Sequence, residues 1–195
     1  MNTSIRNNWT LEEIKSIYHS PLLALVYQAA GIHIQFHQAD KLKLSTLISV
    51  KTGACEEDCS YCAQSSRHKT NIKPSILNQD ETLRLAEQAL DNGVPRVCLS
   101  ASWKKIPQNK FENILDTIKK VKAMGLNVCL TMGTVSEEQA EQLSAAGINA
   151  YNHNIDTSKE FYDKIITTRT FDSRIETLKT LQKHNVNICS GGIIG

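Results

Sequence analysis

Three cysteines lie within eight residues and could together bind a metal centre. Cys55, Cys59 and Cys62 follow one another with three and then two residues between them. This spacing suits three corners of a 4Fe-4S cube, whose fourth iron then stays open for another ligand, whereas electron-transfer clusters use four cysteines. The alternative is a zinc site with His68 as the nearest fourth ligand, although zinc loops favour paired C-x-x-C motifs.

Three further cysteines are spaced like equivalent positions in repeating strand-helix units. Cys98, Cys129 and Cys189 lie 31 and then 60 residues apart, close to one and two such units. In each predicted strand the aliphatic residues have one parity and the cysteine has the other, so the three thiols should face the same way. A single strand cysteine is more often a small buried hydrophobe, but the shared parity and spacing favour a common site.

The segment 151–156 adds polar side chains beside these thiols. Asn152, Asn154 and Asp156 share one parity and could point with the cysteines. The alternative is that they cap a strand end or a turn. His153 has the opposite parity, which predicts a packing residue.

Strand-like and helical patterns alternate from about residue 44 onward. Five β-rich runs are predicted near 44–50, 95–100, 126–131, 149–154 and 186–190. The predicted helices between them end at Gly93, Gly125, Gly147 and Asn185. This alternation favours a parallel sheet, either open and doubly wound or closed as a (βα) barrel. Converging strand thiols favour the barrel.

Capping boxes predict where three helices begin, because each box satisfies two free N–H groups of the first turn. The boxes are Thr10–Glu13, Ser136–Gln139 and Ser173–Glu176. The first of them predicts a helical extension over residues 1–43. Residues 44–195 then form the incomplete barrel of this α/β chain.

The composition narrows the classes of partner. The chain has 195 residues, 41% hydrophobic and 22% charged, with a formal net charge of +2. That charge is too small and too interspersed to predict a nucleic-acid or membrane surface. The longest apolar run, at 22–26, is too short to cross a bilayer. We therefore expect a cytoplasmic protein, in which six reduced cysteines indicate metal binding or catalysis rather than disulfides.

The cysteine loop resembles the C-x3-C-x-aromatic-C signature of radical S-adenosylmethionine (SAM) enzymes, with Tyr61 as the aromatic residue on the cofactor side. Within that superfamily the chain is similar to the biotin synthase family. The stretches that carry this resemblance are 45–53, 66–70, 151–157, 165–170 and 189–195. They occur in order over almost the whole chain.

The resemblance implies two iron-sulfur clusters. A 4Fe-4S cluster would be bound by Cys55, Cys59 and Cys62, with SAM at the open iron. A 2Fe-2S cluster, regarded as the sulfur source, would be bound by Cys98, Cys129 and Cys189.

Further residues match binding positions of the family. Asn154 and Asp156 correspond to positions that bind the SAM ribose, and Asn152 with Asn154 to positions near the ureido ring of dethiobiotin. Gly191 and Ile193 resemble the start of the adenine-side motif. No side chain is expected to act as a catalytic acid or base.

The implied reaction is the last step of biotin biosynthesis. Reductive cleavage of SAM gives a 5'-deoxyadenosyl radical, which abstracts hydrogen from dethiobiotin, and the carbon radical then takes sulfur from the second cluster. A flavodoxin-type protein would supply the electron, and the full-length enzyme would be a homodimer. About five of the eight βα units of a complete barrel are present. We therefore expect that this chain alone does not complete the reaction, and the alternative function is a non-catalytic iron-sulfur or metal-binding remnant.

Overall fold

The computed structural model describes residues 5–194. The chain divides into two compact units, Met1–Lys43 and Leu44–Gly195. Residues 1–4 of the expected helical extension lie outside the described residues, and so does Gly195 at the end of the stretch 189–195.

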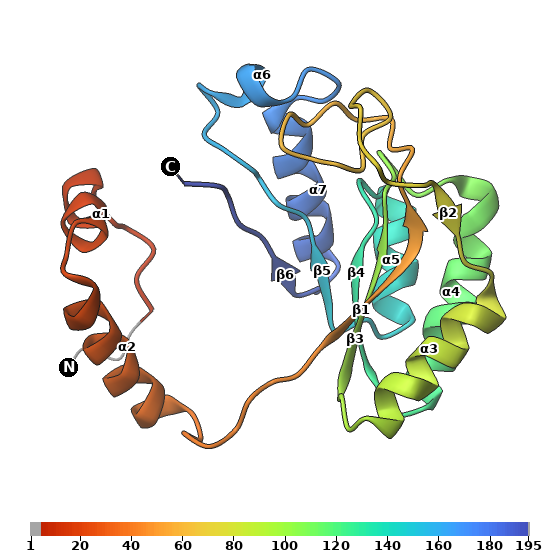
Figure 1. The fold of residues 1–195 in the computed structure, drawn as a ribbon, viewed down its shortest axis with the longest axis horizontal. Coiled ribbons are helices and arrows are strands. Elements are labelled where there is room, and N and C mark those ends of the chain that lie inside the picture. Colours follow the sequence, from red (N-terminus) through yellow and green to blue (C-terminus); the bar gives the residue numbers. More distant parts are fainter. Residues whose placement is uncertain (1–4, 195) are drawn as a thin grey trace. The chain divides into compact units, whose positions relative to one another are not determined.

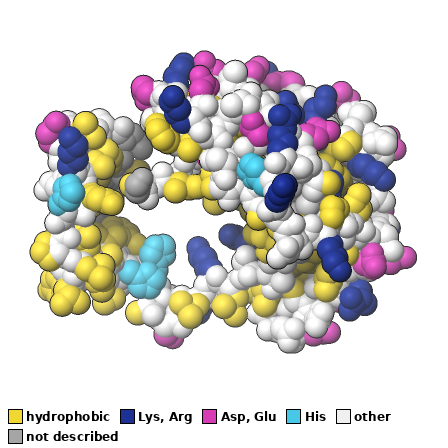
Figure 2. Space-filling model, turned by 45° about the horizontal axis from the view of Figure 1, so that its top comes forward, with side chains coloured by type: hydrophobic (Ala, Val, Ile, Leu, Met, Phe, Trp, Pro, Cys, Tyr) yellow, Lys and Arg dark blue, Asp and Glu magenta, His cyan; other side chains and the backbone are white. Residues whose placement is uncertain are grey.

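The first unit consists of two helices, α1 (Leu11–Tyr18) and α2 (Leu22–Phe36) (Figure 1). The capping box Thr10–Glu13 is present at the start of α1, which confirms that prediction. Apolar side chains on both helices are exposed, as the yellow surface of this unit in Figure 2 shows. In the described part of the chain, no helix is both long enough and apolar enough to span a membrane.

The second unit contains a six-stranded sheet with the order β2-β1-β3-β4-β5-β6. The strands are β1 (Thr46–Thr52), β2 (Ser75–Ile76), β3 (Arg96–Ala101), β4 (Asn127–Thr131), β5 (Ala150–Asn152) and β6 (Ile188–Cys189). All neighbours pair in parallel except β1 and β2, which are antiparallel. The five predicted parallel strands are confirmed, whereas two-residue β2 is too short to give a periodic pattern.

Helices connect the successive parallel strands. They are α3 (Gln79–Asp91), α4 (Gln108–Ala123), α5 (Glu137–Ala145), the short α6 (Tyr162–Ile165) and α7 (Phe171–Lys183). Because the parallel strands β1, β3, β4, β5 and β6 follow one another across the sheet without a reversal, right-handed connections place these helices on one face (Figure 1). A doubly wound sheet would reverse its order and have helices on both faces. The fold is therefore a partial (βα) barrel.

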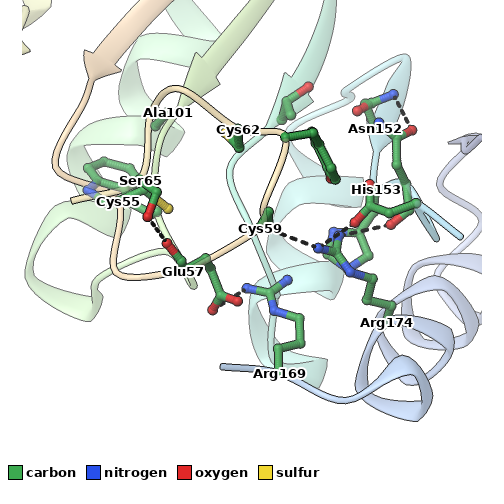
Figure 3. Close-up of a pocket in the computed structure, with 16 residues that line it drawn as sticks. Cys55, Glu57, Cys59, Cys62, Ser65, Ala101, Asn152, His153, Arg169 and Arg174 are labelled. Carbon is green, nitrogen blue, oxygen red and sulfur yellow. Dashed lines mark hydrogen bonds and ion pairs between the residues drawn. The ribbon is translucent and has the colours of Figure 1, made fainter. Parts of the chain in front are cut away.

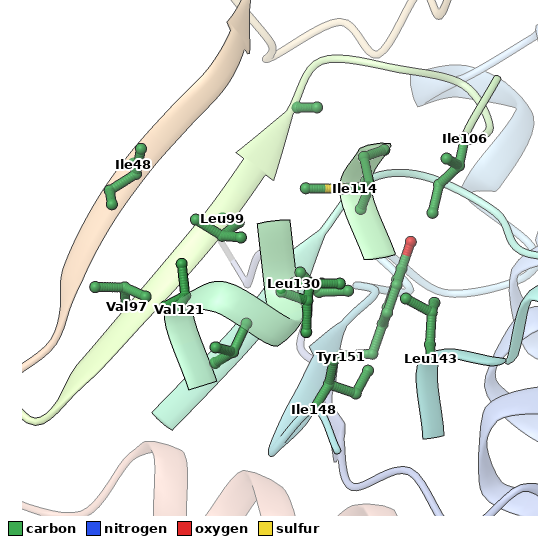
Figure 4. Close-up of a cluster of buried hydrophobic side chains, with 14 of the residues drawn as sticks. Ile48, Val97, Leu99, Ile106, Ile114, Val121, Leu130, Leu143, Ile148 and Tyr151 are labelled. Carbon is green, nitrogen blue, oxygen red and sulfur yellow. The ribbon is translucent and has the colours of Figure 1, made fainter. Parts of the chain in front are cut away.

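The core lies between the sheet and its helices (Figure 4). Val97, Leu99 and Leu130 point from the strands into this core, where they meet apolar residues of α4 such as Ile118 and Val121. These five side chains are almost completely buried. Because strand side chains alternate, the intervening residues, including the strand cysteines, face the other side of the sheet.

One predicted helix start is wrong. The box Ser136–Gln139 caps α5 as expected, but α7 begins at Phe171 rather than after Ser173. Thr170 has the extended backbone of an N-cap, and its hydroxyl accepts the Ser173 N–H. Two hydroxyl residues three positions apart competed for the cap, and the earlier one starts the helix.

Gly133, after β4, provides a test of how tightly the strand ends are held. Its φ is +83°, and an added Cβ would lie 2.5 Å from the carbonyl oxygens of Trp103 and Lys104. Gly133→Ala should lower the free energy of unfolding by about 3 kcal/mol, because steric overlap adds to backbone strain.

Gly93→Ala is the matched control, since Gly93 has φ +71° but no atom within 4 Å of an added Cβ. This variant should lose only about 1 kcal/mol. Urea unfolding of both variants measures the difference, and equal losses would contradict the close approach at Gly133.

Candidate functional site

The carboxyl ends of four parallel strands and the loops that follow them surround a cavity of about 190 Å³ (Figure 3). Parallel strands end at the same edge of a sheet, so residues far apart in sequence meet there. Seven of the predicted site residues line the cavity: Cys55, Cys59, Tyr61, Cys62, Asn152, Asn154 and Asp156. Trp103 lines it as well.

The cysteine loop folds back on itself directly after β1. Gly53 and Ala54 have φ of 70° and 48°, which turns the chain out of the strand. The Cys55 N–H then donates to the Gln64 carbonyl at 2.9 Å, and the Ser66 N–H donates to the Cys55 carbonyl at 2.9 Å. These bonds bring the first cysteine close to the chain that follows the third.

Lys51 fixes the start of this loop. Its Nζ donates to the carbonyl oxygens of Gly53 at 2.6 Å, Ala54 at 3.0 Å and Ser102 at 2.8 Å. One ammonium group therefore ties the end of β1 to the end of β3. The sequence pattern did not single out this lysine.

The three cysteines are free thiols, with Cys55 and Cys59 buried and Cys62 half-buried. Burial raises the pKa of Cys55, and it raises the pKa of Cys59 to about 11 although the Arg174 charge opposes that rise. Both thiols are therefore protonated at neutral pH in the free chain. Soft metals displace such protons and bind the thiolate, so this donor set fits an iron-sulfur centre.

A cluster and a single metal ion place different demands on the three thiols. Among the described residues, no three His, Cys, Asp or Glu side chains converge as ligands of a single ion. In a cubane each cysteine binds a different iron, so such convergence is not required. His68, the fourth ligand of the zinc alternative, lies with Nδ1 3.0 Å from the Cys62 carbonyl oxygen.

Arg174 of α7 joins the cysteine loop to the end of β5. Its guanidinium donates to the Tyr162 hydroxyl at 2.6 Å and to the Asn154 carbonyl at 2.9 Å. Its Nη2 lies 2.6 Å from Asp156 Oδ2 and 3.8 Å from Cys59 Sγ. The Asp156 contact is a buried ion pair, because both side chains are less than 10% exposed.

Backbone bonds hold Asp156 in a left-handed conformation with φ 66°. The Asp156 N–H donates to the Gly191 carbonyl at 3.2 Å, and the Asp156 carbonyl accepts from the Ile193 N–H at 2.7 Å. Gly191 and Ile193 thus lie beside the cavity rather than in its described lining. Tyr61 lies near Asp156: burial, and then the neighbouring Asp156 carboxylate, raise the pKa of the Tyr61 phenol.

His153 is buried, as expected of a packing residue, but it also contributes to the cavity lining. Burial, followed by the charges of Arg174 and Arg169, lowers the pKa of His153 to about 3. The ring is therefore neutral, and within the described structure its Nε2 has no hydrogen-bond partner.

The second set of cysteines lies on the sheet face opposite the helices. Cys98 aligns with Cys129 on the neighbouring strand, and Asn152 aligns with Cys189. Burial, and then the adjacent Cys98 and Cys189, raise the pKa of Cys129 to about 12. The Asn152 amide donates to Cys189 Sγ at 3.3 Å. The three thiols are thus neighbours on one face.

Comparison with known proteins identifies the family. Residues 49–195 match the Radical SAM superfamily. The chain belongs to the radical SAM superfamily.

Curated relatives of this radical SAM chain include biotin synthases from several organisms. The chain is 49% identical over 193 residues to "Biotin synthase" of Nostoc punctiforme, covering 98% of this chain and 58% of that protein. It is 48% identical to "Biotin synthase" of Schizosaccharomyces pombe, covering 98% and 53%. With "Biotin synthase, mitochondrial" of Arabidopsis thaliana the identity is 45%, covering 97% and 51%. The chain thus spans a little more than half the length of these relatives.

Solved structures share the fold at low sequence identity. The hydrogenase maturase HydG of Carboxydothermus hydrogenoformans has a TM-score of 0.77 at 15% identity, covering 96% of this chain and 43% of that one. Methylornithine synthase (PylB) has a TM-score of 0.75 at 18% identity, covering 94% and 54%. These likenesses confirm the partial-barrel fold of the radical SAM chain.

Arg174 allows a direct test of how the site is held together. Arg174→Met keeps the length of the side chain but leaves the buried Asp156 carboxylate and Tyr162 hydroxyl without their partner. The free energy of unfolding should fall by about 3 to 5 kcal/mol, because an uncompensated charge remains buried.

Lys159→Met is the matched control, since it breaks the exposed ion pair of Lys159 with Asp172. Exposed pairs contribute little, so no measurable change is expected. Urea unfolding of both variants measures the contrast, and an Arg174→Met chain as stable as the control would contradict the central position of this arginine.

Proposed function

We propose that this chain carries the cluster and SAM site of a biotin synthase, which converts dethiobiotin to biotin by radical sulfur insertion. The observation that carries the proposal is the presence of two separate cysteine sets on one α/β sheet. One set, Cys55, Cys59 and Cys62, opens into the cavity at the strand ends. The other set lies on β3, β4 and β6 of the same sheet. The 45–49% identity to biotin synthases along the whole chain supports the same assignment.

In this proposal the first cysteine set holds the 4Fe-4S cluster. When bound there, the cluster supplies the electron that splits SAM into methionine and a 5'-deoxyadenosyl radical. Asp156, held in place by its backbone bonds, accepts hydrogen bonds from the SAM ribose hydroxyls, with Asn154 beside it. Gly191 and Ile193 lie on the adenine side, where glycine allows close approach of the backbone.

The second cysteine set, Cys98, Cys129 and Cys189, is assigned to the 2Fe-2S cluster, which would supply the sulfur atom. Asn152 links this set to the cavity, because its amide bonds to Cys189 and lies 3.4 Å from Asn154 Oδ1. The two asparagines can exchange hydrogen bonds with the N–H and C=O groups of the ureido ring. The substrate would then lie between the SAM site and the sulfur source.

The proposed partners follow from the reaction. Reduction of the cluster requires an electron donor, for which a flavodoxin-type protein is the expected class. Homodimer formation and a cytoplasmic location stay predictions from the sequence.

The decisive experiment is anaerobic reconstitution of the 195-residue chain with iron and sulfide, followed by SAM, dithionite and dethiobiotin. We expect a 4Fe-4S signal in electron paramagnetic resonance and formation of deoxyadenosine. Cys59→Ala should abolish both, because it removes a ligand of the cluster at the cavity. Cys129→Ala should retain both and lose only the 2Fe-2S absorption.

The two variants are controls for each other, since each removes one thiol from a different set. Clusters without deoxyadenosine would refute the enzymatic proposal and favour a non-catalytic iron-sulfur remnant. Bound zinc instead of iron would refute both. Formation of biotin by the isolated chain would support the enzyme and contradict the expectation that the chain alone does not complete the reaction.

A further inference from the structure

The segment 165–169, between α6 and α7, contacts the cysteine loop along its length. The Ser60 N–H donates to the Ile165 carbonyl at 3.0 Å, although the two residues are far apart in sequence. The residues that follow Ile165 contact Glu57 and Asp58, which stand between the first two cysteines. Glu57 and Asp58, together with Thr167, Thr168 and Arg169, are called the latch below.

Asp58 forms several hydrogen bonds within the latch. One of its carboxylate oxygens accepts the backbone N–H groups of Thr167 at 2.9 Å and Thr168 at 3.2 Å. The other accepts the Thr167 hydroxyl, and the Asp58 N–H donates to the Thr168 hydroxyl oxygen at 3.2 Å. Both the side chain and the backbone of Asp58 are therefore fixed by two consecutive threonines.

Glu57 forms the buried half of the latch. Its carboxylate lies 3.2 Å from the Arg169 guanidinium, and both side chains are at most 6% exposed (Figure 3). The Thr168 hydroxyl lies 2.7 Å from Glu57 Oε2 and 2.9 Å from Asp58 Oδ1. Since this hydroxyl has only one hydrogen, it donates to one of the two carboxylates at a time, and both lie within its reach.

Lys104, after β3, connects the latch to the sheet. Its Nζ donates to the Thr168 carbonyl at 2.6 Å, and its own carbonyl accepts from Arg169 at 2.5 Å. The latch is thus attached to the rigid end of a central strand. At the other end of the segment, Thr170 begins α7, the helix that carries Arg174.

We propose that the latch is a positioning device that sets the separation of Cys55 and Cys59 before any cluster binds. The inference rests on the proposed role of these cysteines as cluster ligands. Three residues separate the two thiols, and two of them, Glu57 and Asp58, are bound by the segment 167–169. The third, Glu56, is exposed. The loop therefore takes its shape from protein contacts, and the cluster enters a site that is already formed.

A buried ion pair seldom adds much net stability, because desolvation offsets the attraction. Such a pair does fix the relative position of its two side chains, since moving either one leaves a buried charge without a partner. Glu57 and Arg169 therefore act on the conformation of the loop more than on the stability of the fold. This separates the latch from residues that only pack.

The test is hydrogen-deuterium exchange of the cluster-free 195-residue chain. Thr168→Val removes the shared hydroxyl at nearly constant volume, and Thr168→Ser keeps it. Thr168→Val should speed exchange in the peptide that spans 54–62 by about tenfold, because hydrogen bonds to charged partners are lost. Thr168→Ser should exchange like the unmodified chain.

Asp58→Asn should give the same local increase, and Glu56→Gln in the same loop should give none. Exchange of β3 serves as the internal reference for the fold. If loop exchange rises no more than β3 exchange in both Thr168→Val and Asp58→Asn, the proposal is overturned, whether or not the sheet has loosened.

The same samples, reconstituted anaerobically with iron and sulfide, separate this inference from the proposed function. If loop exchange rises as expected in the variants but the unmodified chain takes up no cluster, the positioning role of the latch stands and the assignment of the cysteines is refuted. Normal cluster uptake together with unchanged exchange in both variants would refute the latch alone.

Discussion

The site depends on one buried guanidinium. Arg174 contacts four groups that come from three separate segments: the Cys59 thiol, the Asn154 carbonyl with the Asp156 carboxylate, and the Tyr162 hydroxyl. A planar cation with donors in several fixed directions can satisfy such a set, whereas an ammonium group cannot. Because burial makes each of these contacts obligatory, the positions of the cysteine loop and of the strand end after β5 are coupled through α7.

The two faces of the sheet divide the tasks of folding and chemistry. On one face, residues such as Val97, Leu99 and Leu130 pack beneath the helices and are almost fully buried. The alternate positions carry the strand cysteines and polar side chains such as Asn152. In a parallel sheet whose other face is covered by helices, functional side chains can lie only on this second face or in the loops at the carboxyl ends of the strands. Both cysteine sets obey that constraint.

Much of this arrangement was predictable from the sequence, because it depends on local pattern. Parity along the strands and the regular interval from Cys98 to Cys129 indicated neighbouring thiols, and the two are aligned in register. The contacts of Arg169 with Glu57 and of Arg174 with Cys59 were not predictable, because each joins residues more than 100 positions apart and no periodic pattern marks such a contact. The stretch 165–170 contributes to the family resemblance, and in the structure its Thr167 and Thr168 bind Asp58 of the cysteine loop.

A loop that only bound metal would need its thiols and little else. In this chain the same cavity is also lined by the Asp156 carboxylate, which is paired with Arg174, and by the neutral His153 ring, whose Nε2 has no hydrogen-bond partner among the described residues. Leaving this nitrogen buried without a bond costs free energy that a purely structural site has no reason to accept. An organic ligand with hydroxyl or N–H groups would satisfy it. The polar groups beside the thiols therefore favour a site that binds a small molecule next to its cluster over one that merely stores metal.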